Sequence, residues 1–209
     1  MSEINVPTFS LLGNWLCLDF ANTVDDRLQA RPEDMFTNYR DLVIWGQQTN
    51  IVSESEAQQM LEEAEWHPEA AKAVLQRAIL LREAIFRIFS AVTQEEDPNA
   101  ADLYLFNTML AEAMSKTCVT GGDGDFAWSW QREDGALDRM LWPVARSAAD
   151  LLTSKVLSSV RQCASETCTW LFLDTSKNQS RRWCDMKNCG NRAKVSRHYE
   201  RKRQSAGKR

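Results

Sequence analysis

The sequence predicts an α+β fold in which a predominantly helical N-terminal domain precedes a small C-terminal module, and two observations lead to this prediction. Apolar residues recur at helical spacing through most of the first 155 residues, with short strand-like segments between the helices. Four cysteines in two equally spaced pairs lie near the C-terminus, in a segment too small to fold on an apolar core alone. We therefore expect one domain over residues 1–155, the module over residues 156–205 and a disordered tail over residues 206–209.

The N-terminal elements expected are a strand and two helices. Residues 15–20 (Trp-Leu-Cys-Leu-Asp-Phe) contain too many apolar side chains for a surface strand, which favours a buried strand that ends in the polar turn 21–23. Aromatic and aliphatic residues at helical spacing predict a helix within residues 34–48. Ser53 and Glu56 have the spacing of a capping box, which predicts that a further helix begins there.

A long helix and a mixed segment follow. Pro68 suits the first turn of a helix, and an apolar stripe with helical period continues to Phe89. Residues 126–130 alternate apolar with small or polar side chains, which predicts a strand with one buried face. The other elements expected are a helix opening at residues 97–98, a loop over residues 120–125, a helix near residues 137–153 that Pro143 interrupts or restarts, and a helix extension or short strand over residues 156–162.

Four cysteines indicate one zinc site. Cys163 and Cys168 form one Cys-x4-Cys pair, and Cys184 and Cys189 form the other. A structural Zn²⁺ takes four thiolates in a tetrahedron, and each pair can fold back as a tight knuckle that supplies two of them. We expect these four side chains to bind one structural Zn²⁺, whose binding would provide most of the module's stability, on the order of 10 kcal/mol.

The segment between the two pairs must return the chain to the metal. Residues 170–174 and 181–183 are strand-like and flank a turn-rich stretch, so we expect a β-hairpin between them and a treble-clef-like or ribbon-like zinc-binding module. The alternative is that the cysteines form two disulfides or remain buried thiols. Disulfides are typical of secreted chains, and residues 1–12 lack the basic start and apolar run of a signal peptide. Because no apolar window is long enough to span a membrane, we expect a cytoplasmic protein.

Charge divides the chain into an acidic and a basic part. Residues 1–154 carry 11 Lys and Arg against 25 Asp and Glu, a net charge of −14, whereas residues 155–209 carry 14 against 4, a net charge of +10. Nucleic-acid phosphate is the commonest partner of such a basic patch. Asn191 is expected to cap a basic helix that follows it. The residues expected to contact nucleic acid are Arg181, Arg182, Arg192, Lys194, Arg197 and Arg201.

The N-terminal part contains a candidate ligand pocket but no catalytic motif. Trp15, Asp19, Asn22 and Thr23 combine apolar and polar character and could line a small-molecule pocket. The alternative is that Asp19 and Asn22 satisfy backbone groups at a turn. The sequence lacks a phosphate-binding Gly-x4-Gly-Lys loop, a dinucleotide-binding Gly-x-Gly-x-x-Gly and a histidine placed as the base of a nucleophilic triad, so we do not expect an enzyme.

Both parts of the chain are similar to a known family. Residues 181–194 read Arg-Arg-Trp-Cys-x-Met-x-x-Cys-Gly-Asn-Arg-x-Lys, and with the pair Cys163-x4-Cys168 they resemble the CGNR zinc-finger family. Proteins of this family place an ABATE domain before the finger, and residues 18–24 and 147–152 are similar to that domain. The resemblance covers nearly the whole chain. It implies a stress-induced transcription regulator whose finger binds duplex DNA.

The sequence therefore predicts a zinc-containing, DNA-binding regulator whose acidic domain acts as a sensor or dimerisation domain. A small-molecule effector and a second copy of the chain are further expected partners. Three other functions stay open: an RNA-binding or ribosome-associated protein, an enzyme of unknown chemistry with a structural finger, and an adaptor that binds an acidic protein. The opposite charges of the two parts also allow the acidic domain to fold against its own finger and inhibit it.

Overall fold

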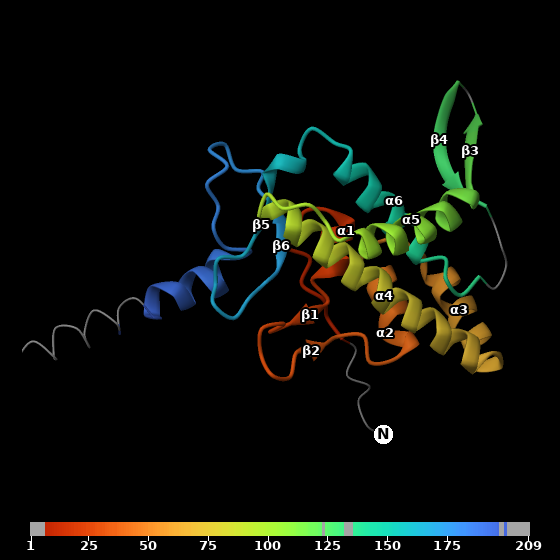
Figure 1. Cartoon of the computed structure of the whole chain (residues 1–209). Coiled ribbons are helices and arrows are strands. Elements are labelled where there is room, and N and C mark those ends of the chain that lie inside the picture. Colours follow the sequence, from red (N-terminus) through yellow and green to blue (C-terminus); the bar gives the residue numbers. More distant parts are fainter. Residues whose placement is uncertain (1–6, 123, 132–135, 197–198, 200–209) are drawn as a thin grey trace, which may run out of the picture.

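The structure is a computed structural model that describes residues 7–122, 124–131, 136–196 and 199 (Figure 1). Among these residues the α-helices are α1 (Leu16–Ala21), α2 (Tyr39–Gln48), α3 (Glu54–Trp66), α4 (Pro68–Thr93), α5 (Ala100–Ser115) and α6 (Leu141–Leu152). Two-stranded antiparallel sheets pair β1 (Val24–Asp25) with β2 (Glu33–Asp34), β3 (Thr117–Gly122) with β4 (Asp125–Trp130), and β5 (Val160–Gln162) with β6 (Leu171–Leu173). Shorter helical turns are η1 (Leu157–Ser159) and η2 (Met186–Gly190), and residues 191–196 are helical. In these ranges no helix combines the length and the apolarity needed to cross a membrane.

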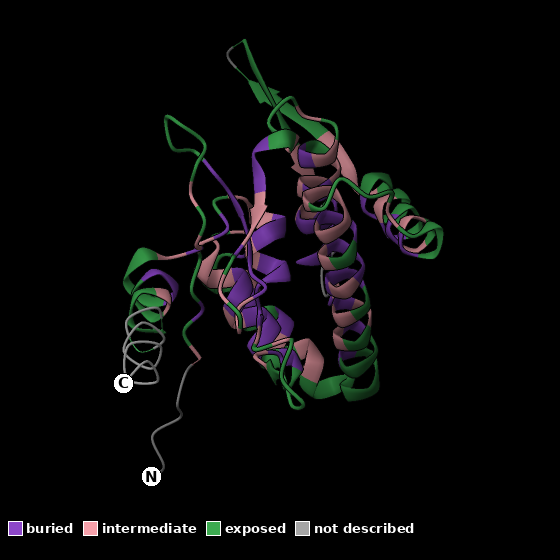
Figure 2. Ribbon diagram, turned by 60° about the vertical axis from the view of Figure 1, so that its left-hand side comes forward, coloured by how far each residue is buried: buried purple, intermediate pink, exposed green. Residues whose placement is uncertain are grey.

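The core of the N-terminal part forms around the long helix α4. This helix contacts every other α-helix from α1 to α6, and it buries Ala78, Leu81 and Ile85 completely. Figure 2 shows the buried residues concentrated on the facing sides of the helices, with exposed residues on their outer sides. The apolar stripe that the sequence predicts between Pro68 and Phe89 is therefore the centre of the core.

Sheet β5–β6 attaches the cysteine-containing module to this core. Val160, Leu171 and Leu173 belong to the same apolar cluster as the helices. The Leu171 N–H donates to Asn22 Oδ1 at 2.8 Å, and Asn22 Nδ2 donates to the Leu171 carbonyl oxygen at 2.8 Å. The Leu173 N–H donates to the Gly13 carbonyl oxygen at 2.8 Å. The helical part thus holds β6 by backbone and side-chain hydrogen bonds, and the domain boundary at residue 155 stays a prediction.

Replacing Asn22 with alanine is expected to lower the free energy of unfolding by about 2 kcal/mol, because the Leu171 N–H and carbonyl would lose partners in a buried environment. Urea denaturation of the full chain followed by tryptophan fluorescence measures this effect. The matched control is Asn107→Ala, because Asn107 lies on the exposed side of α5. Equal effects of the two substitutions would show that the Asn22 hydrogen bonds do not hold β6.

Several local predictions are confirmed. Ser53 and Glu56 form the capping box of α3, with hydrogen bonds in both directions. Pro68 is the first residue of α4.

Helices α5 and α6 begin later than predicted. Asn99 caps α5, so this helix begins at Ala100 and not at residues 97–98. Helix α6 begins at Leu141 and contains Pro143 in its first turn, where a proline does not interrupt a helix.

The predicted strand at residues 15–20 is wrong, because this segment forms helix α1. The Leu18 and Asp19 N–H groups both donate to the Trp15 carbonyl oxygen. Helix α1 packs against α4, α6 and β6, so most of its side chains are buried. A short apolar run that is covered on several sides has no periodicity that separates a helix from a strand.

Helix α2 is shorter than the predicted segment 34–48. The Asn38 side chain accepts a hydrogen bond from the Asp41 N–H, and the Asp41 carboxylate accepts one from the Asn38 N–H, so a capping box starts the helix at Tyr39. Asp34 instead belongs to β2, which pairs with β1.

The segment predicted as a loop at residues 120–125 belongs to a β-hairpin. Strands β3 and β4 pair from Thr117 opposite Trp130 to Gly122 opposite Asp125. The strand predicted at residues 126–130 is confirmed, but its expected buried face is wrong, because Phe126 is 80% exposed and Trp128 is 61% exposed.

The module also differs from its predicted hairpin. Strand β6 pairs with β5, which precedes the first cysteine pair, and residues 181–183 form no strand. The cap predicted at Asn191 is wrong, because Asn191 itself is helical and directly follows η2. Asp185 caps the start of η2, where its carboxylate accepts a hydrogen bond from the Lys187 N–H at 3.0 Å. The predicted tail at 206–209 lies outside the described residues.

Candidate metal centre and basic surface

Two different local structures supply the two cysteine pairs. Cys163 directly follows β5 and Cys168 lies shortly before β6, so the first pair occupies the loop of a hairpin that the Cys163 N–H closes by donating to the Trp170 carbonyl oxygen at 2.8 Å. Cys184 precedes η2, and Cys189 lies within it. A hairpin knuckle followed by a ligand pair at a helical turn is the treble-clef-like alternative of the sequence prediction.

The four cysteine side chains form one cluster with the dimensions of a tetrahedral metal site. All four Sγ atoms lie within 4.8 Å of one another. Cys184 Sγ lies 3.7 Å from both Cys168 Sγ and Cys189 Sγ. A zinc–sulfur bond of about 2.3 Å gives a tetrahedron with edges of about 3.8 Å, whereas a disulfide would require about 2.05 Å. The cysteines therefore fit a four-thiolate metal ion and are not paired in disulfides.

The electrostatics of the cluster favour a bound cation. Hydrogen bonding from the Cys168 and Cys184 thiols lowers the pKa of Cys163 to about 2, and the Cys184 N–H also donates to Cys163 Sγ at 3.4 Å. Hydrogen bonding to Cys163 raises the pKa of Cys168 to about 12 and also raises the pKa of Cys184. One thiolate therefore suppresses the ionisation of its neighbours. A divalent cation would offset the repulsion between neighbouring thiolates and allow all four cysteines to bind it as thiolates.

Arg181 supports the metal centre from inside the module. Its guanidinium donates to the carbonyl oxygens of Trp183, at 2.9 Å, and of Cys184, and it lies 4.5 Å from the centre of the Phe172 ring. The Arg181 N–H donates to the buried Asp174 carboxylate at 2.8 Å. The sequence assigns Arg181 to nucleic-acid contact, but the structure engages its side chain with the knuckle backbone. Two adjacent arginines give no sequence signal that tells which one turns inward.

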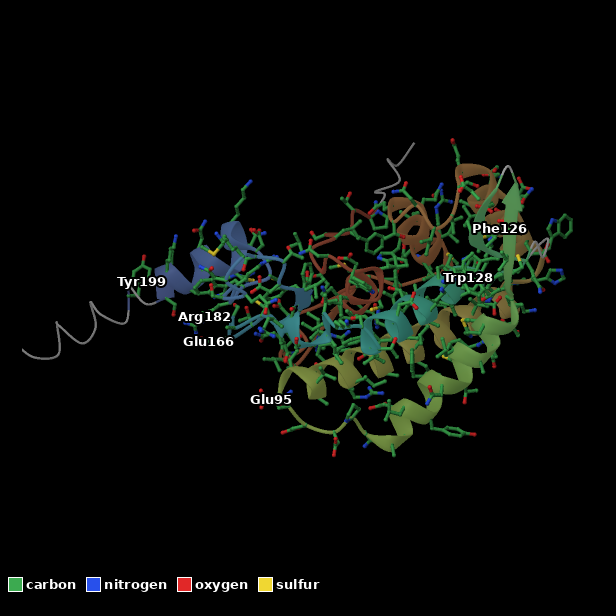
Figure 3. All side chains as sticks on the ribbon, turned by 90° about the horizontal axis from the view of Figure 1, so that it is seen from above. Glu95, Phe126, Trp128, Glu166, Arg182 and Tyr199 are labelled. Atoms are coloured by element: carbon green, nitrogen blue, oxygen red, sulfur yellow. The ribbon has the colours of Figure 1, made fainter. Side chains whose placement is uncertain are left out.

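Arg182 and Arg192 form a basic surface on the outside of the module. Both side chains are exposed, and they border a cavity of about 310 Å³. The Arg182 guanidinium lies 5.6 Å from the Trp183 ring centre, and Arg192 Nη1 donates to Thr167 Oγ1 at 3.1 Å. Figure 3 labels Arg182 beside Glu166, which lines the same cavity. Lys194 is exposed on the helical stretch 191–196, while the predicted contacts Arg197 and Arg201 lie outside the described residues.

The N-terminal part presents carboxylates to another side of the module. A cavity of about 220 Å³ separates sheet β1–β2 from the cysteine cluster, and Asp25, Asp26 and Glu33 line it together with Cys184 and Arg192. Burial raises the pKa of Asp25, and the neighbouring Asp26 and Glu33 carboxylates raise it further. The acidic part of the chain therefore meets the basic module at this junction, while Arg182 is outside it.

The four residues predicted as a ligand pocket make hydrogen bonds to the backbone instead of lining either of these cavities. Trp15 Nε1 donates to the Ser147 carbonyl oxygen, Thr23 Oγ1 donates to that of Phe20, and Asn22 pairs with the Leu171 backbone. Asp19 Oδ1 accepts from the Gly13 N–H at 2.7 Å, and burial raises its pKa to about 6. This geometry supports the alternative that these side chains satisfy backbone groups, and ligand binding there stays a prediction.

Comparison with known families covers both parts of the chain. The ABATE model, described as "Putative stress-induced transcription regulator", matches residues 14–155. The CGNR zinc finger model matches residues 159–202, which contain all four clustered cysteines, so the cluster is one metal-ion site of a zinc finger. A comparison with curated proteins found no match. The family description is that of a transcription regulator and not of an enzyme. The chain belongs to the ABATE family, with a CGNR zinc finger after its ABATE domain.

Proposed function

We propose that this protein is a cytoplasmic, zinc-dependent transcription regulator that binds duplex DNA through the exposed arginine surface of its zinc finger. The observation that carries the proposal is the pair Arg182 and Arg192 at the edge of one cavity on the outer side of the module. Guanidinium groups donate several hydrogen bonds in a fixed plane, which suits phosphate oxygens and guanine edges. The hydroxyl groups of Ser165, Thr167 and Ser196 line the same cavity and are further donors for phosphate.

The four-cysteine cluster supports this proposal because a metal ion bound there would fix the chain segments that carry both arginines. Arg182 lies two positions before Cys184, and Arg192 lies three positions after Cys189. Zinc bound to both cysteines would hold these chain segments at a constant separation, so the two guanidinium groups would meet DNA without a large loss of conformational entropy. The helical stretch that begins at residue 191 carries Lys194 outward from the same base.

DNA is favoured over RNA because the family description is that of a transcription regulator. In this proposal Arg182, Arg192 and Lys194 contact the phosphate backbone, and Arg197 and Arg201 extend the contact along the basic segment. The ABATE domain would supply the regulatory input, for which a stress signal or small-molecule effector is the expected source. Arg192 also borders the cavity that Asp25, Asp26 and Glu33 line. A movement of these carboxylates relative to Arg192 would therefore alter the electrostatic potential at the DNA-binding surface.

The double variant Arg182→Ala/Arg192→Ala is expected to weaken DNA binding at least tenfold near 0.1 M salt and to reduce the slope of log K against log salt by about 2, because two phosphate contacts are lost. Fluorescence anisotropy of the zinc-loaded chain with a random-sequence duplex, measured over a salt series, gives both quantities. The matched control is Arg40→Ala/Lys72→Ala, which removes two exposed cations from the acidic domain. Zinc content is determined for every variant.

Three outcomes would contradict the proposal. An unchanged affinity and slope in the double variant would move the contact to another surface. Tighter binding of a single-stranded RNA competitor would favour the RNA-binding alternative. Absence of salt-dependent binding to either nucleic acid would leave the protein adaptor as the better explanation.

A further inference from the structure

The hairpin β3–β4 projects from the helical domain on the side away from the zinc finger (Figure 1). Val119 is directly opposite Trp128 in the strand register, and Phe126 lies two positions before Trp128, so these three side chains share one face of the hairpin. Val119 is 58% exposed, Trp128 is 61% exposed and Phe126 is 80% exposed. Figure 3 shows Phe126 and Trp128 on this projecting element. An exposed apolar patch of a few hundred Å² is often a functional surface of a protein.

The exposed face is held in place by the domain beneath it. Trp130, on the same face, packs against Trp142 with ring centres 6.1 Å apart. The Arg146 guanidinium lies 4.7 Å from the Trp128 ring centre. A Cβ atom at Gly121 would lie 2.5 Å from a carbon of the Phe126 ring, so the ring occupies the space that a side chain at position 121 would need. The aromatic side chains are therefore arranged before any partner binds.

The charge of the hairpin limits which partner can bind there. Among the described residues of β3 and β4 the only charged side chain is Asp125, and the domain that carries the hairpin has a net charge of −14 over residues 1–154. Nucleic acid and anionic membranes would be repelled, because these strands offer no cation to their phosphates. A second copy of this surface brings no phosphate charge to it, and each copy carries the Arg146 guanidinium beside its Trp128 ring. Within the described part of the chain this sheet has two strands, and each has an edge that pairs with no other described strand.

We propose that the Val119–Phe126–Trp128 face and an adjoining strand edge of the β3–β4 hairpin form the interface of a homodimer. A twofold axis beside β4 would pair the two copies of this strand antiparallel and place the aromatic side chains of one copy against those of the other. Because antiparallel pairing of the two β4 strands leaves both aromatic faces on the same side of the joined sheet, the contact buries only part of the roughly 400 Å² that two aromatic side chains and one valine expose. The buried area is therefore less than half of the ~800 Å² per partner of a standard interface. The dimer is therefore weak and depends on protein concentration.

Dimerisation through this hairpin leaves both zinc fingers accessible, since the finger lies at the other end of the molecule (Figure 1). If the proposed DNA binding is correct, the dimer presents two fingers to two half-sites. The interface itself does not rest on that function, because its test uses no nucleic acid.

Sedimentation velocity of the zinc-loaded full chain from about 1 to 200 μM tests the proposal. The wild-type chain should shift from monomer towards dimer, and Phe126→Ser/Trp128→Ser should dissociate at least tenfold more readily, because association loses its aromatic contacts. Val119→Lys adds a positive charge to the apolar face of each copy and should have a similar effect that weakens at high salt. Both variants change exposed side chains, and circular dichroism confirms that they fold. Tyr104→Ser, at an exposed aromatic residue in the first half of α5, is the matched control and should dimerise like the wild type.

The proposal would be overturned by a wild-type chain that remains monomeric at the highest concentration. It would equally be overturned by hairpin variants that dimerise as readily as the wild type. If the monomeric wild-type chain sediments with phosphatidylcholine vesicles while Phe126→Ser/Trp128→Ser does not, the face would be assigned to a membrane surface instead.

Discussion

Replacing Cys184 with serine is expected to abolish stoichiometric zinc binding and to unfold the two cysteine-containing turns of the zinc finger while the helical domain stays folded. Cys184 Sγ lies 3.7 Å from two other ligand sulfurs, so this residue is central to the four-cysteine cluster. A serine hydroxyl does not ionise near neutral pH and is a poor ligand for zinc. The two cysteine-containing turns would lose most of the roughly 10 kcal/mol that metal binding contributes to such modules, whereas β5 and β6 pack in the main apolar core and should stay folded.

Zinc content by elemental analysis and near-ultraviolet circular dichroism of the tryptophans measure this result. Cys118→Ser is the matched control, since Cys118 lies in β3 and outside the cluster, and it should retain one zinc ion per chain. Retention of full stoichiometry by Cys184→Ser would reject the four-cysteine site.

Replacing Arg82 with methionine is expected to lower the free energy of unfolding by about 2–4 kcal/mol. Arg82 is 2% exposed, and its Nη1 and Nη2 atoms donate to the two carboxylate oxygens of Asp34 at 2.7 Å each. Methionine keeps the packing of the aliphatic stem but leaves the carboxylate without its partner. The effect stays below that of a fully buried pair, because water still reaches the Asp34 side chain, which is 39% exposed.

The effect of this substitution should depend on pH. Burial by itself would raise the pKa of Asp34, but the hydrogen bonds from Arg82 outweigh it and hold the pKa below its usual value. A carboxyl group with a lowered pKa stabilises the folded state above its unfolded pKa of about 3.9 and loses this contribution as the pH falls through the folded pKa. The stability difference between wild type and Arg82→Met should therefore shrink below about pH 4.

Urea denaturation at neutral and acidic pH measures both effects. Arg77→Met is the matched control, because the partly exposed ion pairs of Arg77 with Glu112 and Asp138 each contribute about 1 kcal/mol or less. Equal destabilisation by the two substitutions would show that the Arg82–Asp34 pair has no special role in tying α4 to β2.

Features that depend only on neighbouring residues can be predicted from the sequence alone. The capping box of Ser53 and Glu56 and the start of α4 at Pro68 need no information beyond a single helical turn, and the structure confirms both. The clustering of Cys163, Cys168, Cys184 and Cys189 follows from the sequence for a related reason. Their spacing within each pair forms a local knuckle, and tetrahedral coordination then brings the pairs together.

Features that depend on contacts between distant parts of the chain could not be predicted in this way. Residues 15–20 form a helix because α4, α6 and β6 surround them, and no periodicity in a short apolar run indicates such neighbours. The alternation at residues 126–130 predicts a strand but not what covers it, and the structure leaves Phe126 and Trp128 exposed. Arg181 turns inward because Phe172 and the Cys184 carbonyl oxygen lie there.

The attachment of the finger to the ABATE domain is the clearest case. Asn22 pairs with Leu171, which lies 149 positions further along the chain, and nothing near either residue indicates the other. Local hydrogen bonds and metal knuckles act over a few residues, and a single sequence records them directly. Burial and long-range pairing are decided by which segments meet when the whole chain folds, so they became visible only in the three-dimensional structure.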